Sequence, residues 1–220
     1  MIILIGHTKG GTGKTTIACN FAGLARAAGT DVVLADLDPR QGSARLWSQV
    51  REERDDVPDV PCVQLEGKVH KSLMDLEQRC ELVIADAGGL DSVELRSAMV
   101  VADLLVAPTE VSMYSMAASE KLFDMIDTAD AVREEPLLRL SLLNKVTPHS
   151  TAAEAESREG REVLKEFGFI PLSSRIANRK AIKRAEALGL TADELKPRDA
   201  SAAGEMRRAF KEVMSHVAGS

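Results

Sequence analysis

A glycine-rich segment near the amino terminus is the part of this sequence that most directly suggests chemistry. Residues 9–16 read KGGTGKTT; they follow the apolar run 2–5 and precede an alanine-rich helical pattern. Glycines allow a close backbone approach, so that successive N–H groups and a helix N-terminus can surround a polyphosphate. In such a loop, Lys14 places a charge at the β- and γ-phosphates, and the Thr15 hydroxyl binds Mg²⁺. The predicted phosphate-binding residues are Gly10, Gly11, Thr12, Gly13, Lys14, Thr15 and Thr16.

The start of this loop departs from the strict Walker pattern. That pattern asks for glycine five residues before Gly13, and Thr8 stands there instead. A second lysine, Lys9, opens the loop, and this substitution is typical of one branch of the proteins that carry phosphate-binding loops. The alternative is a glycine-rich turn that only joins a strand to a helix, but the strand–loop–helix context favours nucleotide binding.

Three aspartates at predicted strand ends could serve a metal ion and a water molecule. Asp36 and Asp38 follow the apolar run 32–35, and Asp86 follows the apolar run 82–85. In open parallel sheets, ligands bind beyond the carboxyl ends of the strands. Asp86 therefore has the position of a Walker B carboxylate, which holds Mg²⁺ directly or through water. Asp36 and Asp38 point to alternate sides of an extended segment, which predicts different roles. A helix cap or a turn is the alternative for any one of the three.

Apolar runs that alternate with helical patterns predict the elements that position these groups. We predict strands at 2–6, 31–36, 60–65, 81–86, 103–108, 137–143 and 168–171. We predict helices at 14–28, 43–53, 69–79, 91–101, 112–130, 151–167, 178–188 and 203–217. This βαβ rhythm indicates an α/β fold with a mostly parallel, twisted sheet and helices on both faces. The 220 residues suit one domain spanning 1–220, without a DNA-binding extension ahead of the loop.

The composition favours a cytoplasmic protein. Three scattered cysteines, Cys19, Cys62 and Cys80, argue against a disulfide framework, and no C-x-x-C pair occurs. No apolar run approaches the roughly 20 residues of a membrane span. The chain begins at once with a predicted strand, which leaves no room for a signal peptide. Aromatic residues make up 3% of the chain, which argues against a protein that stacks single-stranded bases.

The net charge of −6 hides a local basic segment. Residues 175–184 read RIANRKAIKR, with five basic residues and no acidic one, while the remainder of the chain is strongly acidic. A positive patch of this kind suits contact with the DNA backbone, and a solvated helix face is the alternative. Because the segment lacks aromatic residues, we expect phosphate contacts without base readout. The candidate DNA-binding residues are Arg175, Arg179, Lys180, Lys183 and Arg184.

The three motifs together resemble those of one family. KGGTGKTT at 9–16, DLDPRQGS at 36–43 and IADAGG at 84–89 are similar to the motifs of the ParA/MinD family of deviant Walker A ATPases. Within this family the chain resembles the small plasmid-partition ParA proteins, over nearly its whole length. The resemblance implies a P-loop NTPase fold and a homodimer that sandwiches ATP, in which Lys9 reaches the partner's nucleotide. It also implies that Asp38 orients the attacking water and that Asp36 lies near the metal.

The resemblance further implies a function and its partners. It predicts a Mg²⁺-dependent ATPase that dimerises on ATP, binds DNA without sequence preference, and is released when a centromere-binding, ParB-like protein triggers hydrolysis. Such a protein associates with the nucleoid and segregates a plasmid or chromosome region. Relatives hold adenine between the loops after the sixth and seventh strands, which predicts roles for Asn144 and Pro171. One departure is Arg40, which is interposed in the usual Asp-Pro-Gln-Gly motif.

Two alternative functions share these motifs. A positioner of non-DNA cargo, such as a protein cluster, would carry every motif described above. A MinD-like ATPase that cycles on membranes would use a C-terminal amphipathic helix, and an apolar stripe there has helical spacing. The plainer interpretation of that stripe is a helix packed against the sheet, which makes membrane binding the less favoured function. The stripe consists of Met206, Ala209, Phe210, Val213, Met214 and Val217.

Overall fold

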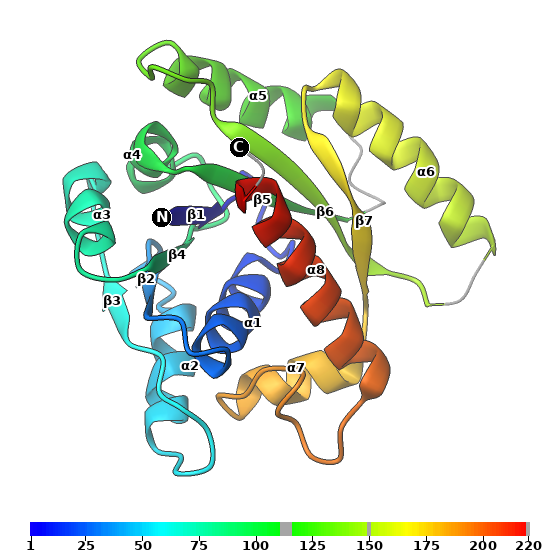
Figure 1. Ribbon diagram of the computed structural model, residues 1–220. Coiled ribbons are helices and arrows are strands. Elements are labelled where there is room, and N and C mark those ends of the chain that lie inside the picture. Colours follow the sequence, from blue (N-terminus) through cyan, green and yellow to red (C-terminus); the bar gives the residue numbers. More distant parts are fainter. Residues whose placement is uncertain (111–115, 149–150, 219–220) are drawn as a thin grey trace.

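A seven-stranded sheet forms the centre of the molecule in this computed structural model, which describes residues 1–110, 116–148 and 151–218. The strand order is β3-β2-β4-β1-β5-β6-β7, and all paired strands are parallel (Figure 1). The parallel sheet predicted from the sequence is therefore confirmed. The strands are β1 (Ile2–Ile5), β2 (Val32–Asp36), β3 (Cys62–Gln64), β4 (Leu82–Asp86), β5 (Leu104–Glu110), β6 (Leu138–Val146) and β7 (Ile170–Ala177).

Helices cover both faces of this sheet, as predicted. In β1, Ile3 and Ile5 pack toward the face that α1, α2, α7 and α8 cover, and Ile2 and Leu4 pack toward the face of α3 to α6. Burial on both faces explains why the strand is a continuous apolar run rather than an alternating one. The helices are α1 (Lys14–Ala27), α2 (Ser43–Glu52), α3 (His70–Glu77), α4 (Val93–Val101), α5 (Met116–Asp130), α6 (Thr151–Glu166), α7 (Lys180–Ala187) and α8 (Ala200–Ala218).

The largest difference from the predicted elements concerns β7. The sequence suggested a short strand at 168–171, whereas the strand runs to Ala177. Gly168, at φ +72°, belongs to the turn that follows α6, so the strand begins later than predicted. Polar residues at 173–175 interrupt the apolar pattern because β7 is an edge strand with one paired side. Part of the predicted helix at 112–130, namely 112–115, lies outside the described residues.

Side chains of α8 cover the outer edge of β7. Glu212 accepts hydrogen bonds from the backbone amides of Ser173 and Ser174 at 2.6 and 2.8 Å. Glu205 accepts a hydrogen bond from the amide of Ala177 at 3.0 Å. These carboxylates bind amides that would otherwise be open to another strand. At the opposite edge of the sheet, β3 is only three residues long.

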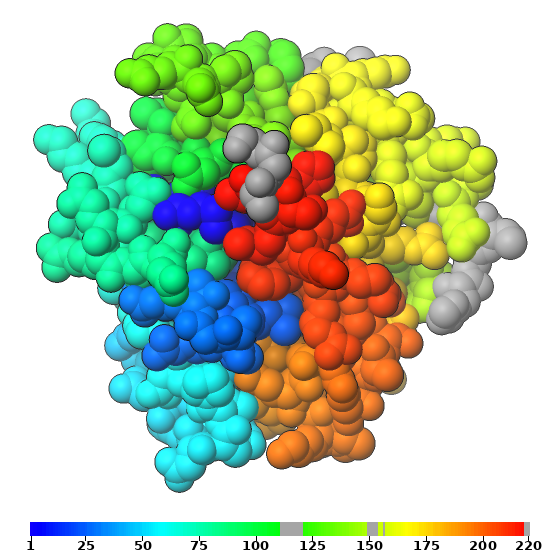
Figure 2. All heavy atoms as spheres, viewed as in Figure 1, coloured from blue at the N-terminus to red at the C-terminus, as the bar shows by residue number. Residues whose placement is uncertain are grey.

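The apolar stripe of α8 packs into the core. Met206, Ala209 and Val213 are at most 1% exposed, and Phe210 packs on Phe21 of α1 with ring centroids 5.3 Å apart. In Figure 2, α8 (red) lies across the middle of the face shown, beside α1 (blue). The plainer interpretation of the stripe is thus confirmed. Among the described residues, no helix combines the length and the hydrophobicity that crossing a bilayer requires.

Candidate functional site

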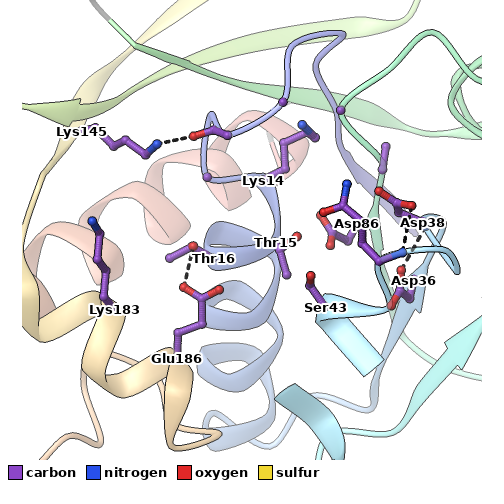
Figure 3. A pocket seen from close by; sticks show the side chains of 16 residues that line it. Lys14, Thr15, Thr16, Asp36, Asp38, Ser43, Asp86, Lys145, Lys183 and Glu186 are labelled. Atoms are coloured by element: carbon purple, nitrogen blue, oxygen red, sulfur yellow. Dashed lines mark hydrogen bonds between the residues drawn. The ribbon is translucent and has the colours of Figure 1, made fainter. Parts of the chain in front are cut away.

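A cavity of about 330 Å³ lies at the carboxyl ends of the central strands (Figure 3). The loop of residues 9–16, called the P-loop below, joins β1 to α1 and lines this cavity. Because β1 lies at the middle of the sheet, the ends of β2 and β4 border the cavity on one side and β6 on the other. The charged residues that line the cavity are Lys14, Asp36, Asp38, Asp86, Lys145, Lys183 and Glu186.

Side chains from β6 hold the backbone of the P-loop. The Asn144 amide donates a hydrogen bond to the carbonyl of Thr12 at 2.7 Å, and the Lys145 ammonium donates one to the carbonyl of Gly11. Gly11 and Gly13 have φ values of +78° and +90°, a region that glycine adopts readily. A Cβ at Gly13 would also lie 2.2 Å from the Asn144 amide nitrogen. The backbone shape and the close packing therefore both require glycine in this loop.

Lys9 is fixed through its backbone, while its side chain is exposed. The Lys9 amide donates a hydrogen bond to Nδ1 of His7 at 3.0 Å, and the Lys9 carbonyl accepts one from the Lys14 ammonium at 3.0 Å. Burial, helped by the charges of Lys14 and Lys9, lowers the pKa of His7 to about 4, so Nδ1 remains an acceptor at neutral pH. Sequence reasoning missed His7, because a single histidine beside a motif has no spacing that could reveal such a role.

Lys14 is buried at the base of the P-loop, near the carboxylates of Asp86 and Asp38. Burial lowers the pKa of its ammonium, and the negative charges of Asp86 and Asp38 partly oppose that effect. A polyphosphate bound in the loop would place more negative charge beside this ammonium and favour its protonated form. The position of Lys14 therefore fits the predicted role at the phosphates.

Two glycines after β4 permit close contacts at the base of the cavity. A Cβ at Gly89 would lie 2.6 Å from the Cα of Gly10 and 3.5 Å from the Lys14 ammonium. A Cβ at Gly88 would lie 2.9 Å from a carboxylate oxygen of Asp38. The Gly-Gly pair thus lets the loop after β4 touch both the P-loop and the turn after β2. The pair of glycines shortly after the strand end is the sequence signal for this contact.

Asp86 has the properties of a metal-binding carboxylate. Burial raises its pKa to about 7, and hydrogen bonding with the Thr15 hydroxyl partly offsets the increase. Its Oδ1 atom is buried and has no hydrogen-bond partner within the described residues. An unpartnered carboxylate oxygen beside a threonine hydroxyl fits Mg²⁺, which takes one or two protein ligands together with phosphates and water. The described part of the chain holds no cluster of three or more His, Cys, Asp or Glu side chains suited to a metal.

Asp36 pairs with Asp86 in the register of β2 and β4, but its oxygens are engaged differently. One oxygen accepts the amide of Asp38 and the other accepts the amide of Arg45, both at 3.0 Å. Burial raises the pKa of Asp36, and these two amides partly oppose the change. The structure therefore places Asp36 beside the predicted metal position, where it holds the turn between β2 and α2.

Asp38 is half-buried and lines the cavity between the P-loop and the turn that follows β2. Its backbone shapes that turn, because the Asp38 carbonyl accepts hydrogen bonds from the amides of Gln41 and Gly42 at 3.1 and 2.8 Å. The Asp38 carboxylate also accepts a longer hydrogen bond from the amide of Gln41, at 3.4 Å, so it contributes to the same turn. Arg40, the interposed residue, is exposed on the same turn.

Among the predicted cofactor-binding residues, Thr12 and Asn144 do not line this cavity but are joined by a hydrogen bond beside it. Pro171 lies away from it altogether. It lies near the start of β7, paired with Ser141, whereas the cavity lies at the carboxyl ends of the strands. The prediction placed Pro171 after the seventh strand because that strand was expected to end at 171. The strand continues to Ala177, so residues 178–179 form the loop that follows it.

That loop borders a smaller cavity that sequence reasoning missed. The cavity adjoins the P-loop and is lined by Gly13, Thr16, Asn144, Asn178 and neighbouring residues of β7 and α7. Asn144 was expected in the loop after the sixth strand, but β6 continues to Val146, so Asn144 lies within that strand and borders this smaller cavity together with Asn178. The alternating apolar residues at 170, 172 and 176 are the signal that could have located the true end of β7.

Two of the three arginines of the predicted DNA patch, Arg175 and Arg179, are engaged in ion pairs. Arg179 donates hydrogen bonds to both oxygens of Glu205, the shortest at 2.7 Å, and both side chains are largely buried. Arg175 lies in β7 and pairs with Glu154 at 3.2 Å. The same Glu205 also binds the amide of Ala177, so Arg179 belongs to the structure that covers the edge of β7.

Helix α7 carries the remaining cations of that patch. Lys180, Lys183 and Arg184 are exposed, and Lys183 also lines the cavity beside the P-loop. On the same helix, Glu186 accepts a hydrogen bond from the Thr16 hydroxyl at 2.8 Å (Figure 3). The predicted basic segment is thus a short helix that presents cations to solvent and also contacts the helix that follows the P-loop.

Comparison with known sequences gives a family and two informative relatives. Residues 3–186 match the CobQ/CobB/MinD/ParA nucleotide binding domain. The chain is 30% identical over 217 residues to the maintenance of carboxysome distribution protein A of Gloeobacter kilaueensis, covering 96% of this chain and 93% of that one. It is 27% identical over 243 residues to the chromosome-partitioning ATPase Soj of Thermus thermophilus, covering 98% and 96%.

A solved structure shares the fold over nearly the whole chain. The cobyrinic acid a,c-diamide synthase of Mycobacterium smegmatis, solved with an ATP analogue and magnesium, superposes with a TM-score of 0.76 at 14% identity. The match covers 98% of this chain and 94% of that one.

Proposed function

Because this chain belongs to the CobQ/CobB/MinD/ParA family of nucleotide-binding domains, we propose that it is a Mg²⁺-dependent ATPase of the ParA type. Its ATP-bound form dimerises, binds DNA without sequence preference, and leaves DNA when a partner protein stimulates hydrolysis. The observation that carries this proposal is Lys9, an exposed lysine on a fixed backbone at the start of the P-loop. Lys14 already supplies the charge for the nucleotide of its own protomer, so Lys9 suits the nucleotide of a second copy.

ATP binding would use the P-loop and the N-terminus of α1. Backbone N–H groups and the Lys14 ammonium surround the phosphates, and Asn144 lies toward the base. Mg²⁺, when bound, would offset the negative charge of the phosphates. Thr15 and Asp86 would hold it, and the unpartnered oxygen of Asp86 supports this assignment. The solved neighbour that contains an ATP analogue and magnesium supports the same cofactors.

Hydrolysis would depend on Asp38 and Lys9. Asp38 lines the cavity and aligns the attacking water, while Lys9 of the partner protomer stabilises the charge on the γ-phosphate. The Asp36 carboxylate accepts a hydrogen bond from the backbone amide of Asp38 and so helps to keep Asp38 in place. Turnover in the dimer is slow until a partner protein completes the site, so that the ATP-bound dimer persists on DNA.

The two lysines of the P-loop provide the test of this proposal. Lys14→Ala should weaken ATP binding by about 100-fold or more, because it removes the charge at the phosphates. Lys9→Ala should retain ATP binding within a few-fold but should not form a dimer, because the contact across the interface is lost. Binding is measured with a fluorescent ATP analogue, and dimerisation by analytical ultracentrifugation with ATP and Mg²⁺.

Lys71→Ala is the matched control, because Lys71 is an exposed lysine on α3, away from the cavity. It should bind ATP and dimerise as the parent protein does. An ATP-dependent dimer of normal affinity in Lys9→Ala would contradict the action of Lys9 in trans. A parent protein that binds no ATP would contradict the proposed function as a whole.

The cargo is proposed from the relatives. One is named for chromosome partitioning and one for carboxysome distribution. Both names describe the positioning of a large body, and we propose that this chain does the same on the nucleoid. With a centromere-binding, ParB-like partner the cargo is a plasmid or chromosome region; with a partner that binds a protein assembly it is that assembly. Stimulation of ATP hydrolysis by the partner, tested with and without its DNA site, separates the two.

A further inference from the structure

Lys145 has a backbone conformation that is unusual for its residue type. It has φ +56° and is the only non-glycine residue with positive φ among the described residues. An L-residue with a long side chain in this left-handed region costs about 1–2 kcal/mol, whereas glycine and asparagine tolerate it. Because lysine is costly at this position, we expect its side chain to make contacts that glycine or asparagine could not make.

The side chain of Lys145 joins two elements at the cavity. Its ammonium donates a hydrogen bond to the carbonyl of Gly11 in the P-loop (Figure 3) and forms an ion pair with Glu110 at 2.7 Å. Glu110 is the last residue of β5 and lies in register with Asn144 on β6. Lys145 therefore links the ends of β5 and β6 to the backbone of the P-loop.

The bond to Gly11 complements the bond that Asn144 makes to Thr12. The two neighbouring β6 residues hold two consecutive carbonyls of the P-loop. Consecutive carbonyls fixed in this way fix the intervening peptide group, and with it the direction of the N–H groups that face a phosphate. Lys145 also lines the cavity and adds positive charge there.

We infer that Lys145 is a positioning residue of the nucleotide site, which fixes the P-loop at Gly11 and has Glu110 as its counter-ion. This inference rests on the proposed binding of ATP at the P-loop. An ion pair of this exposure contributes little to stability, and the backbone strain opposes stability. The presence of lysine at position 145 is therefore explained by its effect on the P-loop rather than by a contribution to the stability of the fold.

The test uses variants that relieve the strain while they remove the ammonium. Lys145→Asn and Lys145→Gly both suit a positive φ, so they should keep or raise the melting temperature. They should bind a fluorescent ATP analogue at least about tenfold more weakly, because a charge-assisted hydrogen bond to the loop is lost. In turnover assays the KM for ATP should rise by a similar factor, with a smaller change in kcat. Lys145→Arg should restore most of the affinity.

Each outcome decides the inference. Parent-like ATP affinity in Lys145→Asn and Lys145→Gly would overturn it. A loss of affinity that follows a loss of melting temperature in both variants, without rescue by Lys145→Arg, would also overturn it and assign Lys145 to stability. Lys14→Ala reports on the site itself: if the parent and Lys14→Ala bind ATP equally weakly, the proposed function fails rather than the role of Lys145.

Discussion

The two sides of the cavity differ in both charge and burial. On the acidic side, Asp36 and Asp86 end β2 and β4, are at most 2% exposed, and stand beside the half-buried Asp38. On the basic side, Lys145 of β6 and Lys183 of α7 are exposed. A carboxylate buried at a strand end loses its hydration, whereas a lysine at the surface keeps much of it, even where hydrogen bonds hold its ammonium as they do for Lys145. The metal and the water of the reaction are therefore expected on the acidic side, and the outer phosphates and DNA on the basic side.

The largest expected effect concerns Asp86 on the acidic side, whose ionisation lowers the free energy of unfolding. Its pKa is raised to about 7, so the neutral carboxyl stabilises the fold at low pH. That stability is fully present below about pH 4 and is lost as the pH rises to about 7. In metal-free protein at pH 8, Asp86→Asn should therefore raise the free energy of unfolding by up to about 4 kcal/mol. Thermal unfolding from pH 4 to 8 measures the difference in stability between Asp86→Asn and the parent protein. This difference should grow up to about pH 7 and then level off.

Asp36 is the control within the same side. Asp36→Asn should lower the melting temperature, because one of its oxygens becomes an NH₂ group that faces a backbone amide. If both variants changed stability in the same direction, the contrast between the unpartnered oxygen of Asp86 and the engaged oxygens of Asp36 would be wrong.

The next effect separates nucleotide binding from hydrolysis. Asp38→Ala should slow single-turnover hydrolysis by about 100-fold or more, because the water loses the group that positions it. ATP binding should persist, and the ATP-bound dimer should accumulate, since the Asp38 carbonyl, which the variant keeps, accepts the two shorter hydrogen bonds of the turn. Rapid-quench measurement of phosphate release tests this. Equal rates in the variant and the parent would remove Asp38 from the mechanism.

The smallest effect concerns the basic side and its outer surface. The double variant Lys180→Ala/Arg184→Ala should bind DNA about tenfold more weakly near 0.1 M salt. The salt dependence of its affinity should correspond to the release of about two fewer counterions. Arg179→Ala should instead lower the melting temperature, because it leaves Glu205 buried without its partner. Gel-shift titrations with ATP compare the two, with Lys71→Ala as the control. A larger loss of DNA affinity in Arg179→Ala than in the double variant would indicate that Arg179 contacts DNA.

The sequence predicted the acidic side and the P-loop more completely than the basic side. Asp36 and Asp86 follow apolar runs directly, so strand position and function are visible in one short segment. The ion pair of Arg179 with Glu205 spans 26 residues, and the bond of Lys145 to Gly11 spans 134. No local pattern reveals contacts of that range. The polar residues of the edge strand β7 interrupt its apolar pattern, so its end was predicted too early and Pro171 was misplaced.

The carboxylates that cover β7 also limit how copies of this chain can associate. Open amides on an edge strand act as a template for strands of other molecules, and such templating leads to aggregation. Glu205 and Glu212 bind three of those amides, and the opposite edge strand is only three residues long. If many copies gather along DNA, as proposed, their sheets would therefore not fuse. Each molecule would then remain able to depart, as the proposed cycle of DNA binding and release requires.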